Sequence, residues 1–389
     1  MPAKNNLAKL AAQSVRPREP LWHGPQVDGI TYSLLCQFLN CRERFRVRVI
    51  EGLAPHDTFN HKIEFGSMWH ACEEGLAVDE DAWKGCLIDY ANALCKRYSM
   101  QQEQVEHWYR VCKAQFPLYV DYWQKHPDVT NRTPLLQEEK FRVPYKLPSG
   151  RTVLLRGKWD SVDLIKGDIR HGTATTGIWL QENKTKGDIR EGLILKQLRF
   201  DLQTMLYMTA LWEEKKDPKS NLFREKSAVK DGGKLTPLWG TNVPILGVRY
   251  NVVRRPLSGG KGTIVRHKPS KSNPAGESAD DFYKRVEQYI KDEPETYFMR
   301  WKVEITAKDV ETFRRTCLDP ILENLCYWWD YINQKDPAPE EYGYGIHYRH
   351  PYGVYNALNE GGATDLDDYL DTGSEVGLRR IGDLFPELT

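Results

Sequence analysis

The sequence predicts an α/β fold in which a central mixed sheet is flanked by helices. Two stretches, residues 152–165 and 176–185, are rich in β-branched and large apolar residues and contain no proline, as β-strands do. Longer stretches with helical periodicity precede and follow them, which is typical of helices packed against a sheet. The two strands are therefore expected at the centre of the fold.

Further elements are expected on both sides of these strands. Additional strands are predicted at 135–145 and 243–254. Helices are predicted at 30–51, 58–78, 79–125, 190–214, 280–290 and 307–332, and residues 215–241 are expected to form a loop or insertion. The expected organisation is a mobile N-terminal arm (1–25), a core with helical insertions (26–335), and an irregular acidic C-terminal extension (336–389).

The two central strands are expected to form an antiparallel hairpin, because residues 171–177 between them are rich in Gly and Thr. Side chains two apart on a strand share a face, so Glu182 and Lys184 point the same way. Unpaired buried charge is unfavourable, so this pair is expected to have a partner. Asp160 on the neighbouring strand is the obvious third member.

An Asp, a Glu and a Lys close together suit metal-assisted cleavage of a phosphodiester. Carboxylates and a backbone carbonyl provide the oxygen ligands that Mg²⁺ prefers. The metal polarises the phosphate and lowers the pKa of a bound water, while a lysine orients that water or stabilises developing negative charge. The alternative is a cross-strand salt bridge on a solvated sheet face, and the spacing alone does not exclude it.

Composition sets limits on the class of protein. The chain has 389 residues, 40% of them hydrophobic and 11% aromatic, so a large core is expected and global disorder is not. A net charge of +1 points to no particular partner, so a nucleic-acid surface has to be a local patch. We expect neither a membrane span nor a secretory signal, because no long apolar run is present.

The cysteines favour a reducing, cytoplasmic location. None of them forms a Cys-x-x-Cys pair, and all are spread through a long chain, as is typical of reduced thiols. They are Cys36, Cys41, Cys72, Cys86, Cys95, Cys112, Cys317 and Cys326.

Two predicted helices carry polar side chains that could join the site. Gly66, His70 and Glu73 fall on one face of helix 58–78, although a lone helical His is often a satisfied structural residue. Gln203 and Tyr207 lie one turn apart on helix 190–214 and could order metal-bound waters or a phosphate. Their ordinary interpretation is a core Tyr with a Gln at its edge.

Residues 254–271 contain six basic side chains and no acid, with glycines that indicate flexibility. Phosphate contact requires basic side chains with reach, so a DNA-contacting loop is one interpretation, and a merely solvated loop is the other. The basic residues are Arg254, Arg255, Lys261, Arg266, Lys268 and Lys271.

Taken in order, these motifs resemble the RecB-like branch of the PD-(D/E)XK nucleases. That branch is recognised by a helix with Gly…His, a strand with Gly-x-x-Asp, a strand with Glu-x-Lys and a helix with Gln-x-x-x-Tyr. The corresponding residues here are Gly66 and His70, Gly157 and Asp160, Glu182-Asn183-Lys184, and Gln203 and Tyr207. The resemblance spans about Ser33 to Tyr207, and residues 201–207 and 247–251 also look similar to phage-encoded members.

The resemblance implies roles for individual residues. Asp160 and Glu182 would be metal ligands with the carbonyl of Asn183, and His70 would lie at the metal's edge as a ligand or water-orienting group. Lys184 would activate or position the attacking water. Gln203 and Tyr207 would bind phosphate or order the site. A further acid is implied on strand 135–145, and Glu138 and Glu139 are both open for it.

Two departures from the family pattern matter. Trp159 stands where the proline of the family's name precedes the Asp. Some members carry an iron–sulfur cluster on four cysteines, one near the position of Cys41 and three near the C-terminus. Here the last cysteine is Cys326, so no iron–sulfur cluster is expected.

The function implied by the resemblance is a Mg²⁺- or Mn²⁺-dependent deoxyribonuclease, with an exonuclease acting from DNA ends favoured, in recombination, repair or degradation of DNA. A structure-selective or nicking endonuclease is one alternative, and a non-catalytic DNA-binding protein that retains the fold is another. DNA is the expected partner, and a homo-oligomer or a recombination partner protein stays open.

Overall fold

The computed structural model describes most of the predicted core. The residues it describes are 20–55, 58–125, 132–167, 176–189, 191–199, 201–217, 228–231, 234–237, 243–257, 263–271, 273–333, 378–385 and 388. The chain divides into two compact units, the smaller built from 1–56, 146–154 and 321–389 and the larger from 57–145 and 155–320. The larger unit contains most of the central sheet and every predicted site residue.

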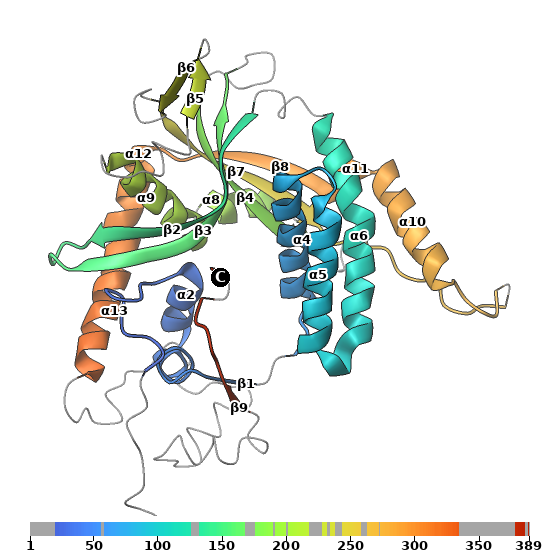
Figure 1. Ribbon diagram of the computed structural model, residues 1–389, viewed down its shortest axis with the longest axis horizontal. Coiled ribbons are helices and arrows are strands. Elements are labelled where there is room, and N and C mark those ends of the chain that lie inside the picture. The colour runs from blue at the N-terminus through green and yellow to red at the C-terminus, as the bar shows by residue number, and fades with distance from the viewer. Residues whose placement is uncertain are drawn as a thin grey trace, which may run out of the picture. The chain divides into compact units, whose positions relative to one another are not determined.

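The central sheet has five strands in the order β2-β3-β4-β7-β8 (Figure 1). They are β2 Arg132–Lys146, β3 Thr152–Ile165, β4 Gly177–Lys186, β7 Ile245–Arg254 and β8 Phe298–Glu304. β3 and β4 pair antiparallel, β4 and β7 parallel, and β7 and β8 antiparallel. The sheet is therefore mixed, and the predicted α/β class and antiparallel pairing of the central strands are confirmed.

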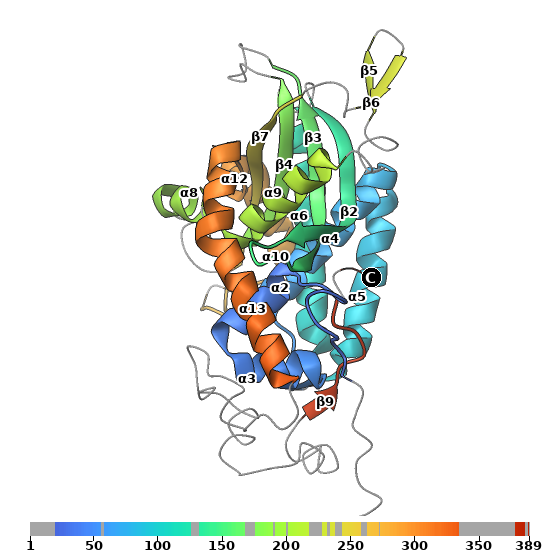
Figure 2. The same ribbon diagram turned by 90° about the vertical axis from the view of Figure 1, so that its left-hand side faces the viewer.

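Helices cover both faces of this sheet. α4 (His61–Val78), α5 (Ala82–Arg97), α6 (Gln102–Gln124) and α10 (Ala279–Asp292) pack together around an aromatic core. Within it Trp69 packs edge-on against Phe116 with ring centroids 5.1 Å apart. α8 (Glu191–Arg199) and α9 (Leu202–Lys216) follow β4, and Figure 2 shows α9 in front of the sheet with α4 and α6 behind it.

The remaining elements are short or belong largely to the smaller unit. The larger unit also contains β5 Ala228–Asp231, β6 Lys234–Pro237, α11 Pro294–Tyr297, α12 Ala307–Phe313, and a π-helical turn at Arg314–Leu318. The smaller unit has α2 Tyr32–Asn40, α3 Arg42–Phe45, a π-helical turn at Arg46–Ile50, and most of α13 Asp319–Ile332. In the same unit β1 Leu53–Pro55 pairs antiparallel with β9 Leu378–Arg380.

Three predicted helices are interrupted, and each break has a local cause. The stretch 30–51 breaks at Cys41, whose backbone is extended at φ −163°. The stretch 79–125 is two helices joined by a 3₁₀ turn, Ser99–Gln101, because Tyr98 leaves the helical conformation at ψ 52°. The stretch 190–214 is interrupted at Asp201, whose extended backbone precedes α9 and whose carboxylate caps that helix by accepting the Thr204 N–H at 2.9 Å.

The strand content was underestimated as well. β8 was not predicted, although its sequence alternates between apolar and polar residues from Met299 to Glu304. The strand is short, and most of its residues are half-buried. β5 and β6 lie in 215–241, where a loop or insertion was expected. The predicted turn between β3 and β4 lies largely outside the described residues, as do most of the N-terminal arm and of the acidic C-terminal extension.

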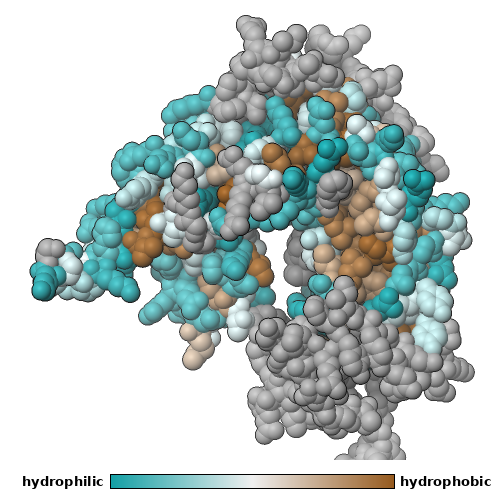
Figure 3. Space-filling model, turned by 180° about the vertical axis from the view of Figure 1, so that it is seen from behind, coloured by the Kyte–Doolittle hydropathy of each residue, from teal (hydrophilic) through white to brown (hydrophobic). Residues whose placement is uncertain are grey.

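Large hydrophobic side chains that reach the surface do so on several different elements. Figure 3 shows hydrophilic residues over much of one face, with hydrophobic residues gathered in places between them. The exposed large hydrophobics include Ile63, Val78, Ile88, Met100, Leu195, Val265 and Tyr289. Among the helices of the described ranges, none combines the length and the hydropathy that crossing a bilayer requires.

Gly157 lets strand β3 approach helix α9 closely. A Cβ placed there would lie 2.5 Å from Cζ of Phe141 and 2.9 Å from Cε1 of Tyr207, and neither distance is tolerated. Gly66 similarly lets α4 approach β4, but less closely: a Cβ there would lie 3.3 Å from Oγ1 of Thr185. Both motif glycines therefore bring a helix close to a central strand.

We expect Gly157→Ala to lower the free energy of unfolding by about 1–3 kcal/mol, because the added methyl group overpacks the contact with Phe141 and Tyr207. Gly85→Ala on α5 is the matched control, since a Cβ there meets nothing within 4 Å. Alanine in that open helical position should be neutral or stabilise by about 0.5–1 kcal/mol. Chemical denaturation of both variants checks this, and equal stabilities would contradict the close approach.

Candidate active site

The central hairpin opens at Asp160. The ladder between β3 and β4 runs as far as the pair Ser161 and Gln181. At the next position a side chain replaces the backbone as hydrogen-bond acceptor: Oδ2 of Asp160 accepts the backbone N–H of Asn183 at 2.7 Å. Asp160 and Ser161 are consecutive, yet both line one cavity with Gln181 and Asn183. Regular strand alternation does not allow that, so the pleat breaks between them, as at a β-bulge.

Beyond this break, β4 presents functional side chains to both faces of the sheet. Asn183 points toward α4, where its Nδ2 donates to Oε2 of Glu73 at 2.7 Å. Lys184 points toward α9, where its Nζ donates to Oε1 of Gln203 at 2.7 Å. Because neighbouring strand residues face opposite ways, the candidate site has an α4 side and an α9 side.

On the α4 side, three carboxylates surround one imidazole. Nδ1 of His70 lies 3.8 Å from Oε2 of Glu73, 3.8 Å from Oε1 of Glu138 and 4.0 Å from Oδ1 of Asp160. We call these four residues the acidic cluster. The three carboxyl side chains are only 10–12% exposed. The Nδ1 atom is buried and makes no hydrogen bond within the described part of the chain.

Glu138 reaches this cluster through an unusual backbone conformation. Its φ of 49° is the only positive value at a non-glycine residue among those the structure describes. In a left-handed conformation the Cβ lies too close to the following carbonyl oxygen, which costs roughly 1–2 kcal/mol. Of the two acids left open by the sequence, Glu138 is the one that faces His70, and its other oxygen lies 2.7 Å from Nζ of Lys158.

A buried hydrogen-bond network that includes Tyr119 and Asn251 fixes the orientation of the Glu73 carboxylate. Tyr119 on α6 donates to Oε1 of Glu73 at 3.2 Å. Asn251 on β7 donates both to the Tyr119 hydroxyl and to Oδ1 of Asn183, the latter at 3.1 Å. The metal-ligand role that the resemblance implies for the Asn183 carbonyl stays a prediction. The side chain and the N–H of Asn183 orient Glu73 and Asp160.

On the α9 side, Lys184 is held between two acceptors. Its Nζ lies 2.6 Å from Oε1 of Glu182 and 2.7 Å from Oε1 of Gln203. Oε2 of Glu182 is buried and has no hydrogen-bond partner within the described residues. The ring of Tyr207 packs edge-on against Phe141 at 5.3 Å, so Gln203 contacts the predicted lysine while Tyr207 lies in the adjoining apolar layer.

Burial and neighbouring charges shift the pKa of most of these groups upward. Burial opposes the charged form of His70, but Asp160, Glu138 and Glu73 outweigh it and raise its pKa to about 10. Burial raises the pKa of Glu73 to about 8, although His70 opposes the shift. Burial raises the pKa of Glu182 to about 7, with Lys184 opposing. In the absence of a metal ion, these groups therefore keep protons that reduce the negative charge of the site.

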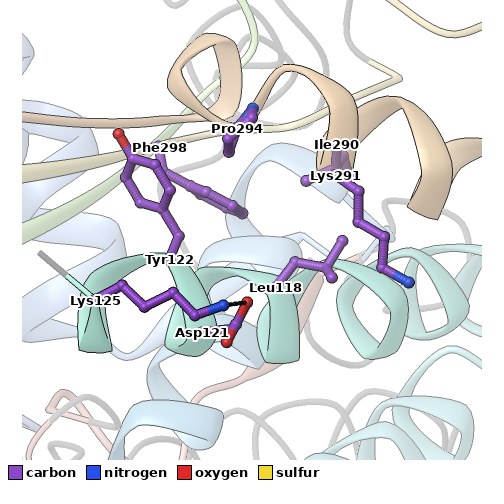
Figure 4. Close-up of a pocket in the computed structure, with 8 residues that line it drawn as sticks. All are labelled: Leu118, Asp121, Tyr122, Lys125, Ile290, Lys291, Pro294 and Phe298. Atoms are coloured by element: carbon purple, nitrogen blue, oxygen red, sulfur yellow. Dashed lines mark hydrogen bonds and ion pairs between the residues drawn. The ribbon is translucent and has the colours of Figure 1, made fainter.

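The acidic cluster opens into a cavity of about 290 Å³. Its lining includes Glu73, Tyr119, Arg132, Gln137, Glu138, Asp160, Ser161, Gln181 and Asn183. A second cavity of about 370 Å³ lies between α6, α10, α11 and β8 (Figure 4). That cavity contains no cluster residue, and its Lys125 is paired with Asp121 at 2.7 Å. The smaller cavity is therefore the one that adjoins reactive groups.

The basic residues expected to contact DNA lie in different environments. Strand β7 runs to Arg254, so the predicted loop begins later than expected, and both Arg254 and Arg255 are buried. Nη1 of Arg255 donates to the carbonyl of Thr185 at 3.1 Å. Nε of Arg266 donates to the carbonyl of Glu277 at 2.9 Å. Lys268 and Lys271 are exposed, and Lys261 lies outside the described residues.

The acidic cluster fits a divalent metal ion. Ligand atoms of His70, Glu73 and Glu138 lie within 4.8 Å of one another. Their donor set, two carboxylates and an imidazole with Asp160 adjacent, consists of groups that coordinate divalent metal ions. Nδ1 of His70 makes no hydrogen bond within the described residues, and this observation favours a ligand here, since a buried polar atom without a hydrogen bond is unfavourable.

Sequence reasoning missed part of this cluster. Glu73 was placed on the same helix face as His70 but was given no role, and its i, i+3 spacing from His70 was the available signal. Lys158, which contacts Glu138, was given no role either.

Comparison with known proteins adds one match. The model of the family described as "PD-(D/E)XK nuclease superfamily" matches residues 30–318, more than half of the chain. No curated protein matches this chain. Nucleases of this superfamily use divalent metals, in agreement with the chemistry of the acidic cluster.

We expect the metal-free protein to lose stability as the pH rises from 5 to 8. Glu73 and Glu182 have folded-state pKa values above their ordinary value of 4.5. The stability that follows from binding those protons is present at low pH and is lost as the pH passes through the folded-state pKa. Glu73→Gln removes one such titration, so the variant should lose less stability over this range.

The measurement is urea unfolding in EDTA at several pH values. Glu103→Gln, on the exposed face of α6, is the control and should follow the wild type. A Glu73→Gln variant with the same pH dependence as the wild type would contradict the raised pKa of Glu73.

Proposed function

The chain belongs to the PD-(D/E)XK nuclease superfamily, and from that premise we propose that it is a Mg²⁺- or Mn²⁺-dependent deoxyribonuclease of the RecB-like branch. The acidic cluster carries this proposal, because His70 and three acids from three different elements face one point. A salt-bridged surface would not bury three carboxylates around an imidazole nitrogen that makes no hydrogen bond in the described chain.

The proposed assignment to the RecB-like branch is supported by the packing of its motif residues. Gly66 and Gly157 both stand where a helix approaches a central strand. Gln203 reaches the lysine of the Glu-x-Lys motif. Each of these residues has a physical reason for its place in the motif.

In the proposed reaction, the acidic cluster would hold the metal through His70, Glu73, Glu138 and Asp160. A divalent cation bound there supplies Lewis acidity toward the phosphate and lowers the pKa of a water. Asn183 keeps the Glu73 and Asp160 carboxylates oriented through its side chain and its N–H.

Lys184 would position the attacking water or stabilise the negative charge that develops on the phosphate. Its ammonium group is fixed for this task by Glu182 and Gln203, both within 2.7 Å. Glu182 would either remain the partner of Lys184 or join the metal through Oε2, which has no hydrogen-bond partner in the described chain.

We favour an exonuclease that acts from DNA ends in recombination, repair or degradation, because the Gln-x-x-x-Tyr branch is rich in end-processing enzymes. Among the predicted DNA contacts, Lys268 and Lys271 are exposed and remain the best placed for phosphate. The spread of the cysteines along the sequence, without a Cys-x-x-Cys pair, supports the proposed cytosolic location.

Cleavage of end-labelled linear DNA, compared with covalently closed circular DNA, tests the proposed function. With Mg²⁺ or Mn²⁺ we expect loss of the linear substrate alone, and EDTA should abolish it. Cutting of the circle would favour a structure-selective or nicking endonuclease. Binding of DNA without cleavage of either substrate would favour a non-catalytic protein that retains the fold.

We expect Lys184→Ala to reduce the cleavage rate about 100-fold or more while leaving metal binding in place, because the lysine acts on the water or phosphate. Lys216→Ala is the matched control, since Lys216 is an exposed lysine on α9 that pairs with Glu213. Rates are measured in single turnover on linear DNA. Equal rates for Lys184→Ala and the wild type would remove Lys184 from the proposed mechanism.

A further inference from the structure

We propose that Lys158 is a positioning residue that holds the Glu138 carboxylate toward His70, so that the strength of cation binding at the acidic cluster depends on it. This inference rests on the proposed function, because it concerns the metal ligands of that site. Lys158 itself contacts neither the imidazole of His70 nor any other group assigned to the reaction except Glu138, within the contacts of the described chain.

Glu138 needs an external restraint because its backbone is strained. A non-glycine residue with a φ of 49° inside a strand persists only where the surroundings over-determine it. If the carboxylate were free to relax, the backbone would favour an extended conformation. That conformation would redirect the side chain, since successive strand residues point to opposite faces.

Lys158 supplies that restraint from the neighbouring strand. Its Nζ lies 2.7 Å from Oε2 of Glu138 and 2.6 Å from Oε1 of Glu74. The Lys158 and Glu138 side chains are 22% and 12% exposed, so their ion pair is shielded from solvent. Lys158 precedes Asp160 by two residues and shares its face of β3. The lysine therefore ties β2 to α4 across the strand that carries Asp160.

Glu74 fixes the direction in which the Lys158 side chain points, because it binds the ammonium group from α4. It follows Glu73 directly on α4, so the helix that provides two members of the acidic cluster also anchors the lysine. Charge–charge attraction to Glu74 keeps the ammonium group at the rim of the cluster. Oε1 of Glu138, the oxygen that faces His70, is left to bind a cation.

Two roles for Lys158 predict opposite changes in cation affinity when its charge is removed: repulsion of the cation, and orientation of the Glu138 carboxylate. A lysine near a cation site repels the cation, so its removal should tighten binding if charge alone matters. If Lys158 holds Glu138 in place, its removal should weaken binding, because a ligand of the cluster is lost. The sign of the change therefore distinguishes the two roles.

The experiment is calorimetric titration of the full chain with Mn²⁺ in the absence of DNA. We expect Lys158→Met to weaken Mn²⁺ binding about 10–100-fold, the usual cost of losing a partner that orients a metal ligand. Lys84→Met is the matched control, since Lys84 is an exposed lysine paired with Asp81, and should leave the affinity unchanged. Unchanged or tighter binding by Lys158→Met overturns the proposal.

A double-mutant cycle with Glu138→Gln tests whether Lys158 acts through Glu138. In the Glu138→Gln background, Lys158→Met should change Mn²⁺ affinity less than twofold, because the ligand it positions is already lost. Persistence of the full effect in that background overturns the proposal. Wild-type protein that binds no Mn²⁺ refutes the metal site of the proposed function and this inference with it.

Thermal unfolding in EDTA checks that each variant folds. Should Lys158→Met unfold at a lower temperature, Lys158→Gln replaces it, since the amide keeps a donor for one carboxylate but no charge. A weaker Mn²⁺ affinity in a folded Lys158→Gln variant supports the proposal, and an unchanged or tighter one overturns it.

Discussion

The hydrogen bond from the Asn183 N–H to the Asp160 carboxylate holds β3 and β4 together where their ladder ends. The Asp160 carboxylate accepts the N–H that a backbone carbonyl would accept elsewhere in the sheet. The strands can therefore separate here without leaving a buried N–H unpaired. Asp160 is thereby turned toward α4 and His70. Glu182 and Lys184 remain on the opposite face, so both sides of the candidate site depend on this one contact.

The second constraint is the concentration of negative charge on the α4 side. Three nearly buried carboxylates at one point are unfavourable unless cations balance them. His70 and Lys158 provide that balance, since Asp160 raises the pKa of the imidazole and Glu138 raises that of the ammonium. The raised pKa of Glu73 shows that the balance is incomplete, because burial leaves it holding a proton up to about pH 8. A divalent cation would complete the balance by replacing that proton.

The sequence predicted what depends on local pattern. The strand-like composition around Asp160 and Glu182 was enough for the central hairpin, and helical spacing placed His70. The break between Asp160 and Ser161 carries no compositional signal, because it involves neither glycine nor proline. The positive φ of Glu138 is likewise invisible in a strand-like stretch, since only the tertiary contacts sustain it. The cap at Asp201 was missed, although Asp is one of the residues that most often cap the start of a helix.

Different layers of the fold support the two sides of the site. β4 and α6 fix Glu73 of α4 through Asn183 and Tyr119, while α9 fixes Lys184 through Gln203. β4 connects them, because Asn183 and Lys184 are consecutive and face opposite ways. A shift of β4 along its own axis would therefore displace both the proposed metal ligands and the proposed water-positioning lysine. The ladder with β7, which pairs Asn183 with Asn251 and Lys184 with Val252, opposes such a shift. The geometry of the site thus rests on the register of its most buried strand pair.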